Sequence, residues 1–204
     1  MGLGNRESSV YLSVAGGKVI RRFNEPQPGT KPRISKTGKQ VHEAAYDFIA
    51  GTITDIEVRD TEFGKFWQVS LADDGVTYKL QFNYSGGNAS SFLKALPNVN
   101  PAIPVTIIPR VKLEGDKTRS SIIMFQQDKA IRWAWTKDNP GELPQLRKIK
   151  IKGVEQWDDS DMMEYLESFV KHEYMPRVRL NKQATMASAA FGAEVPDAEE
   201  DTPF

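Results

Sequence analysis

Cysteine is absent from this chain of 204 residues, and histidine occurs only twice. Without cysteine the chain has no disulfide, no thiol nucleophile and no thiolate ligand for a zinc ion. Neither His42 nor His172 lies in a metal-ligand or nucleophile pattern, and there is no P-loop and no nucleophile elbow. We therefore expect a protein that is not an enzyme and that uses no metal or cofactor.

Long apolar runs are missing as well. No stretch approaches the roughly 18 residues that a membrane-spanning helix needs, and residues 1–10 contain no hydrophobic signal core. We expect a protein without a membrane span or an export signal. The expected location is the cytoplasm, a reducing compartment that the absence of cysteine also fits.

Charge of one sign is not in excess, because 27 Lys and Arg balance 27 Asp and Glu. Five of the acids lie between Glu194 and Phe204, where no Lys or Arg occurs, so the remainder carries 27 − 22 = +5. A basic body with an acidic tail is typical of nucleic-acid-binding proteins. We predict a folded body over residues 1–180 and a disordered acidic tail over 181–204.

The hydrophobic periodicity between Ile49 and Phe125 predicts three strands, a helix and two more strands. The strands are expected at 49–58, 65–71, 76–84, 105–113 and 118–126, and the helix at 90–96. This is the order of the OB-fold, a partly open five-stranded barrel that binds oligonucleotides; an antiparallel meander with one helix is the alternative. The alternation slips near Thr54 and Asp55, which indicates a bulge in a long first strand that serves both halves of the barrel.

Further elements flank this mainly β unit. Val10–Val14 and Lys18–Phe23 read as an N-terminal hairpin, followed by a mobile loop rich in proline and glycine. A strand is expected within Gln145–Val154, and an amphipathic helix at about Asp161–Lys171. The acids before that helix are interpreted as its N-cap rather than as a metal site, and its apolar stripe as core or as a homodimer contact.

Basic and aromatic residues are interleaved along this chain. Residues 18–39 hold seven Lys and Arg and one acid, which favours a basic flap over a nucleic-acid backbone, although a solvated connector is the alternative. Further cations alternate with core residues along the predicted strands, and aromatics beside them are candidates for base stacking. The predicted DNA-binding residues are Arg21, Arg22, Lys31, Arg33, Lys36, Lys39, Lys65, Phe66, Lys79, Tyr84, Arg110, Lys112, Lys148, Lys150 and Lys152.

Three of these predictions have open alternatives. Phe66 either stacks on bases or packs under the N-terminal hairpin. Ile131, Trp133 and Trp135 share one face of a strand, and the two tryptophans are interpreted as core in preference to a stacking platform. The three lysines of 148–152 serve either phosphate contacts or protection of an edge strand from aggregation.

The chain ends in Glu199, Glu200, Asp201, Thr202, Pro203 and Phe204. This tip resembles that of bacterial single-stranded DNA-binding proteins, in which acids lead to Asp, Ile, Pro and a terminal Phe. In that family the tip docks replication and repair proteins, with the Phe in an apolar pocket and the acids on a basic rim. Thr202 stands where the family has isoleucine. The organisation of the body resembles phage-encoded single-stranded DNA-binding proteins.

The resemblance implies binding and protection of single-stranded DNA in replication, recombination or repair, with recruitment of replication proteins through the tip. A phage-encoded protein would act in the host cytoplasm. Two alternatives remain open: a metal-dependent nuclease whose carboxylates converge in space, and an adaptor whose OB barrel binds protein. The one-signed basic loop argues against the adaptor.

Overall fold

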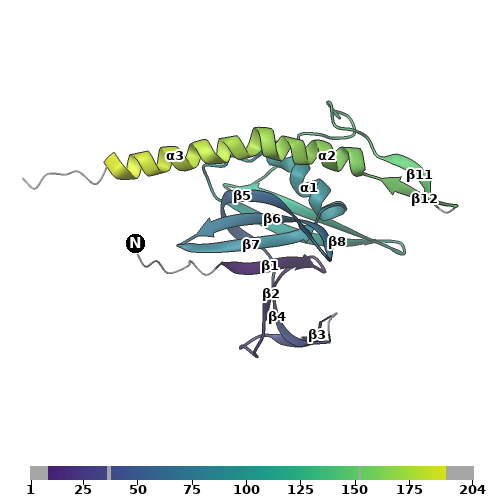
Figure 1. Cartoon of the computed structure of the whole chain (residues 1–204), viewed down its shortest axis with the longest axis horizontal. Coiled ribbons are helices and arrows are strands. Elements are labelled where there is room, and N and C mark those ends of the chain that lie inside the picture. The colour runs from purple at the N-terminus through teal and green to yellow at the C-terminus, as the bar shows by residue number, and fades with distance from the viewer. Residues whose placement is uncertain (1–8, 36–37, 152, 192–204) are drawn as a thin grey trace, which may run out of the picture.

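The computed structural model describes residues 9–35, 38–151 and 153–191. Its fold is mainly β, with one large mixed sheet, a separate two-stranded hairpin, a short helix and a long C-terminal helix (Figure 1). The strands are β1 Val10–Ala15, β2 Lys18–Phe23, β3 Lys31–Ile34, β4 Gln40–Tyr46, β5 Ile49–Thr61, β6 Gly64–Asp73, β7 Val76–Asn83, β8 Val105–Glu114, β9 Lys117–Gln126, β10 Lys129–Ala130, β11 Arg147–Ile151 and β12 Val154–Asp158. The helices are α1 Gly87–Ala95 with the 3-10 turn η1 Leu96–Asn98, then α2 Ser160–Phe169, the π-helical turn η2 Val170–Tyr174 and α3 Met175–Phe191.

The large sheet has the order β10-β9-β8-β5-β6-β7-β1-β2-β4-β3. All five strands expected between Ile49 and Phe125 are present, with α1 between β7 and β8. β1 and β7 run parallel, while the other pairs are antiparallel. The prediction of a mainly β fold is confirmed, but strand pairing among the described residues does not close this sheet into a barrel.

The long strand β5 pairs with two neighbours in succession. Its first residues, from Ile49 to Gly51, pair with β8, and the part from Thr52 onward pairs with β6. The register shifts between Ile53 and Asp55, so the predicted bulge is confirmed. Gly51 lies at the bend, where a Cβ would come within 2.9 Å of the Ala72 carbonyl oxygen. The bulge returns apolar residues to the core side and lets one strand serve both halves of the sheet.

The core lies on the side of the sheet that carries Trp67, Val69 and Leu71, all of them at most 1% exposed. α1 packs on β9, where the Ile122 N–H donates a 2.7 Å hydrogen bond to Oγ of Ser91. The approach is so close that a Cβ at Gly87 would lie 1.9 Å from the Ser120 carbonyl oxygen. α1 ends where η1 begins, close to the stop that Pro97 predicts.

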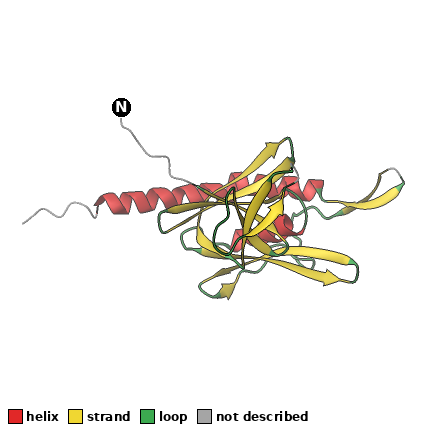
Figure 2. Cartoon of the chain, turned by 90° about the horizontal axis from the view of Figure 1, so that it is seen from below, coloured by secondary structure: helices red, strands yellow, loops and turns green. Residues whose placement is uncertain are grey.

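The C-terminal helix is longer than the predicted segment. It continues from α2 through η2 into α3, which ends at Phe191 (Figures 1 and 2). Pro176 has no N–H to donate to a carbonyl one turn earlier, and the Met175 N–H instead reaches the Val170 carbonyl in the π pattern. Residues 181–191, which the sequence pattern assigns to the tail, belong to α3, while 192–204 lie outside the described residues.

Two other segments differ from expectation. The residues after Phe23 form β3 and β4 rather than a continuous loop, because β4 pairs with β2 on one side and with β3 on the other. Ile131, Trp133 and Trp135 lie in a loop and not on a strand. β11 and β12 form the separate hairpin, called here the arm, at the N-terminal end of α2 (Figure 1).

No helix in the described part of the chain is both long and apolar enough to span a bilayer.

Candidate nucleic-acid interface

The sheet face opposite the core carries a ladder of polar side chains across β5, β6, β7 and β1, called here the polar face. Glu57, Gln68, Gln81 and Ser13 are register neighbours in this ladder. Nε2 of Gln68 donates to Oε1 of Glu57 at 2.6 Å, and Nε2 of Gln81 donates to Oε1 of Gln68 at 2.9 Å. These bonds fix the side-chain amides, and Gln68 is only 3% exposed, so the groups that the polar face offers to a ligand lie at its flanks.

Two aromatic residues flank this ladder. Tyr11 lies beside Lys79 in the register of β1 and β7, is 56% exposed, and has the Lys79 Nζ 5.5 Å from its ring centroid. Phe66 lies opposite Asn83 and is half-buried on the same face. Sequence reasoning identified Phe66 and Lys79 but missed Tyr11. The sequence signal that could have identified Tyr11 is its place between Val10 and Leu12, where strand alternation puts an aromatic ring on the polar side.

The predicted basic flap is folded and partly neutralised. Arg22 and Arg33 both reach Oε1 of Glu43 on β4, at 2.9 and 2.7 Å, and Lys18 pairs with Asp47. These acids lie just beyond the one-signed window of residues 18–39, and strand pairing brings them back onto it. Exposed ion pairs of this kind are weak, but they lower the net positive charge that the flap offers a phosphate.

The remaining flap cations are dispersed. Lys31 and Lys39 are exposed, and Lys36 lies outside the described residues. Arg21 points to the opposite side of β2 from Arg22, and its guanidinium lies 4.7 Å from the Phe23 ring centroid. The flap is therefore not one continuous basic surface.

A groove of about 460 Å³ lies between α1 and the β8–β9 hairpin, called here the Trp133 groove. Its lining residues are Gly87, Ser90, Ser91, Lys112, Glu114, Thr118, Arg119, Ser120, Ser121 and Trp133. Trp133 is 47% exposed, and Nζ of Lys94 lies 5.8 Å from its ring centroid. Burial lowers the pKa of Lys94. An exposed indole beside hydroxyls and cations is a combination that proteins use to bind single-stranded nucleic acids.

Two cations at this groove share one acid. Lys112 lies 3.3 Å from Oε1 of Glu114, and Arg119 lies 2.7 Å from Oε2 of the same residue. Arg110 is exposed on the same side of β8 as Lys112. Of the predicted residues, Lys112 thus lines the groove with Trp133, and Arg110 lies on the same side of β8.

The two tryptophans of residues 133–135 have different environments. Trp135 is partly buried and makes edge-to-face contacts with Tyr165 and Phe169, at 5.8 and 5.3 Å between ring centroids. The core interpretation is correct for Trp135, whereas the exposed Trp133 does not fit it. A loop conformation, and not strand alternation, sends the two rings in different directions.

Tyr84 is held in place by contacts with other residues of the fold. Its ring stacks on Trp67 with centroids 5.7 Å apart and an interplanar angle of 6°, and Lys65 Nζ lies 5.2 Å from its centroid. Its hydroxyl donates a 2.7 Å hydrogen bond to Oε2 of Glu167. Burial, and then this bond to the carboxylate, raise the pKa of Tyr84 well above its ordinary value. A structural role accounts for Tyr84 and Lys65 better than base stacking does.

The arm carries a third exposed aromatic with a lysine. Trp157 is 63% exposed, and Nζ of Lys148 lies 5.4 Å from its ring centroid and 3.7 Å from Oε2 of Glu155. Lys150 lies opposite Glu155 in the register and is exposed, while Lys152 lies outside the described residues. Arg147 ties the base of the arm to α2 through Asp161, at 2.8 Å.

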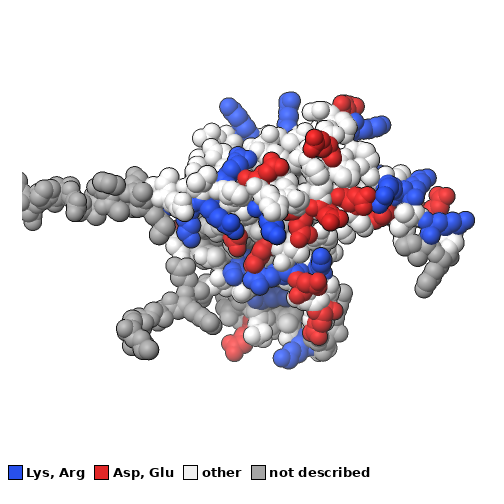
Figure 3. All heavy atoms as spheres, turned by 45° about the horizontal axis from the view of Figure 1, so that its top comes forward, with Lys and Arg blue, Asp and Glu red and all other residues white. Residues whose placement is uncertain are grey.

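Positive and negative side chains are interspersed over the face of the molecule shown in Figure 3. The described residues contain no cluster of three or more His, Cys, Asp or Glu that could hold a metal ion. The predicted partner-binding tip, residues 199–204, lies outside the described residues. No protein family, no curated protein and no solved structure matches this chain.

Proposed function

We propose that this protein binds and protects single-stranded DNA with little sequence preference, through an OB-fold. The single observation that carries the proposal is a repeated pair: an exposed aromatic ring with a lysine Nζ within 6 Å. The pairs are Tyr11 with Lys79, Trp133 with Lys94, and Trp157 with Lys148. A ring stacks on any base, and the neighbouring cation contacts the phosphate beside it, so such pairs bind single strands without reading sequence.

The strand order supports the OB-fold part of the proposal. β9-β8-β5-β6-β7 follows the expected order of the OB barrel, with α1 between β7 and β8 and a bulged first strand shared by both halves. The β1–β2 hairpin lies across the open side, since a Cβ at Gly17 would approach the Val111 nitrogen to 3.0 Å. In this proposal the hairpin, rather than a ladder of hydrogen bonds, completes the barrel.

The proposal extends to recombination, replication or repair, where single strands are exposed. The acidic tip, Glu199 to Phe204, would recruit replication proteins, an expectation that rests on its resemblance to the bacterial tip. The helix α3 ends at Phe191, which leaves 13 residues, 192–204, beyond it.

The fluorescence of the four tryptophans tests this proposal. Trp133 and Trp157 are exposed, whereas Trp67 and Trp135 are not. An oligo-dT strand at saturation should quench the emission, and Trp133→Phe together with Trp157→Phe should remove most of the quench. The control variant Trp135→Phe should keep it. Absence of any saturable binding of oligo-dT would overturn the proposal.

A further inference from the structure

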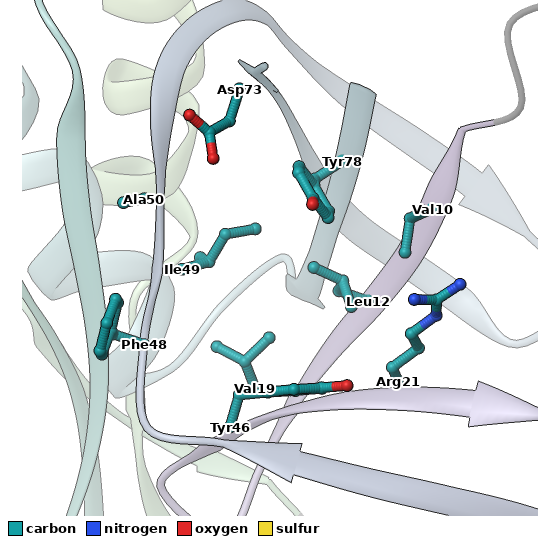
Figure 4. A pocket seen from close by; sticks show the side chains of 10 residues that line it. All are labelled: Val10, Leu12, Val19, Arg21, Tyr46, Phe48, Ile49, Ala50, Asp73 and Tyr78. Atoms are coloured by element: carbon teal, nitrogen blue, oxygen red, sulfur yellow. The ribbon is translucent and has the colours of Figure 1, made fainter. Parts of the chain in front are cut away.

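A pocket of about 280 Å³ lies on the core side of the sheet, apart from the polar face and the Trp133 groove (Figure 4). It is formed where the β1–β2 hairpin, the β4–β5 connection and the end of β6 meet. The lining residues are Val10, Leu12, Val19, Arg21, Tyr46, Phe48, Ile49, Ala50, Asp73 and Tyr78. Its volume is at the lower end of small-molecule sites, which begin near ~300 Å³.

The walls of this pocket are aromatic and its floor is aliphatic. Tyr46 is 45% and Phe48 is 55% exposed, although both rings adjoin a buried floor that includes Leu12 and Val19. In Figure 4 the rings of Tyr46 and Tyr78 lie on opposite sides of Leu12. The pocket therefore offers a flat planar group an aromatic wall and an apolar base.

The polar groups lie at its ends. Arg21 is drawn at one end in Figure 4 and Asp73 at the other. Among the described residues no ion pair joins Arg21 to a carboxylate, in contrast to Arg22, which is paired with Glu43. The Arg21 guanidinium is instead held 4.7 Å from the Phe23 ring centroid. A guanidinium without a carboxylate partner at the mouth of an aromatic pocket is suited to a phosphate.

The pocket is held in place by its surroundings. The ion pair between Lys18 and Asp47 joins β2 to the β4–β5 connection, which carries Tyr46 and Phe48 on either side of Asp47. Gly17 lies against the backbone of β8, so the β1–β2 hairpin cannot move far. The site is preorganised, which reduces the ordering cost of binding.

We propose that this pocket holds one unpaired nucleobase of a DNA single strand against its aromatic walls, with the adjoining phosphate on Arg21. The inference rests on the proposed function and adds a defined base subsite to it. Asp73 accepts a hydrogen bond from the base. All four bases carry an N–H donor on their pairing edge, so the subsite tolerates each of them.

Photocrosslinking tests the subsite directly. An oligo-dT strand containing one 5-iododeoxyuridine is bound to the full chain, irradiated, and the crosslinked peptide is mapped by mass spectrometry. We expect crosslinks at Tyr46, Phe48 or Tyr78. Crosslinks confined to other aromatic residues would overturn the subsite while leaving single-strand binding in place. A strand that neither binds nor crosslinks would overturn the proposed function as well.

Charge-matched variants supply the second measurement. Arg21→Ala should weaken binding of oligo-dT about 10-fold, and the slope of log affinity against log salt should fall by about 1. Arg179→Ala removes the same charge from the exposed side of α3. It should change affinity by less than about 3-fold, because salt screens the attraction between a distant charge and the strand. Equal effects of the two variants would contradict a phosphate contact at Arg21. Thermal melting of each variant establishes that it is folded.

Discussion

The hydroxyl of Tyr84 donates a 2.7 Å hydrogen bond to Oε2 of Glu167, which lies 83 residues further along the chain. The bond joins the end of β7 to α2. The Trp67 Nε1–H donates to the Tyr84 carbonyl at 2.9 Å, which holds Tyr84 against β6. The C-terminal helix is thereby attached to the sheet through a polar contact as well as through its apolar side. This attachment should be visible in the pH dependence of stability.

Stability should fall at alkaline pH. The folded state raises the pKa of Tyr84 through burial and Glu167, and raises the pKa of Tyr174 through burial. A raised pKa means that the folded form holds a proton that the unfolded chain loses near pH ~10. The contribution is complete below pH ~10 and is lost as pH rises further. Denaturant unfolding at several pH values between about 8 and 11 measures this loss of unfolding free energy.

Tyr84→Phe isolates one part of this effect. The variant should lose about 1 kcal/mol of unfolding free energy at neutral pH, because the bond is only partly shielded from water. Between pH ~8 and ~11, a range that spans the ordinary pKa of tyrosine, the variant should also lose less stability than the native chain. Tyr11→Phe, at an exposed position, serves as the control. An unchanged alkaline slope in Tyr84→Phe would show that the bond does not link folding to protonation.

Trp133 and Trp135 should respond differently to alanine. Trp133→Ala should weaken single-strand binding by about 1–3 kcal/mol with the fold intact, because the indole is exposed in its groove. Trp135→Ala should lower the unfolding free energy by about 3 kcal/mol, because it removes the contacts to Tyr165 and Phe169. Fluorescence anisotropy and denaturant unfolding separate the two effects. If Trp133→Ala unfolds the protein instead, its ring belongs to the core.

The polar face gives a third prediction. Tyr11→Ala and Phe66→Ala should each reduce oligonucleotide affinity, by about 1–3 kcal/mol where the ring stacks on a base. Phe63→Ala serves as the control. Phe63 is an aromatic residue that is 84% exposed at the turn between β5 and β6, and it does not line the Trp133 groove. Anisotropy titration at fixed salt measures all three. Unchanged affinity in both Tyr11→Ala and Phe66→Ala would remove the polar face from the interface.

Much of the fold could be predicted because alternation of apolar residues is a local property. The Trp67, Val69 and Leu71 series placed β6 and its buried side, and the slipped alternation near Thr54 placed the bulge. The β2–β4 pairing could not be predicted, because it depends on a contact across a segment rich in proline and glycine. The length of α3 was missed because a polar, alanine-rich helix has no apolar stripe to mark it.

The site was predicted less well, since charge and exposure depend on what strand pairing brings together. Residues 18–39 hold seven cations and a single acid in sequence, yet Glu43 and Asp47 return to pair with three of these cations. Arg21 and Arg22 are adjacent in sequence and lie on opposite sides of β2. Tyr84 was predicted to bind DNA, but a partner 83 residues away holds its hydroxyl.

The acidic tail supplies a fourth prediction. Deleting Glu194 to Phe204 should leave DNA binding intact or make it tighter, most visibly at low salt, because five acids then no longer compete with the strand. Deleting Phe204 alone should leave DNA affinity nearly unchanged while abolishing docking of replication proteins. Substantially weaker DNA binding by a folded protein that lacks residues 194–204 would place the tail within the binding site.

The most direct measurement compares labelled single-stranded and double-stranded oligonucleotides of equal length, titrated with the full chain at two salt concentrations. The account predicts that the single strand binds more tightly, and that its affinity falls steeply and roughly linearly on a log-log scale as salt rises. Equal affinity for the duplex, or an affinity that does not depend on salt, would contradict single-strand binding as the function of this protein.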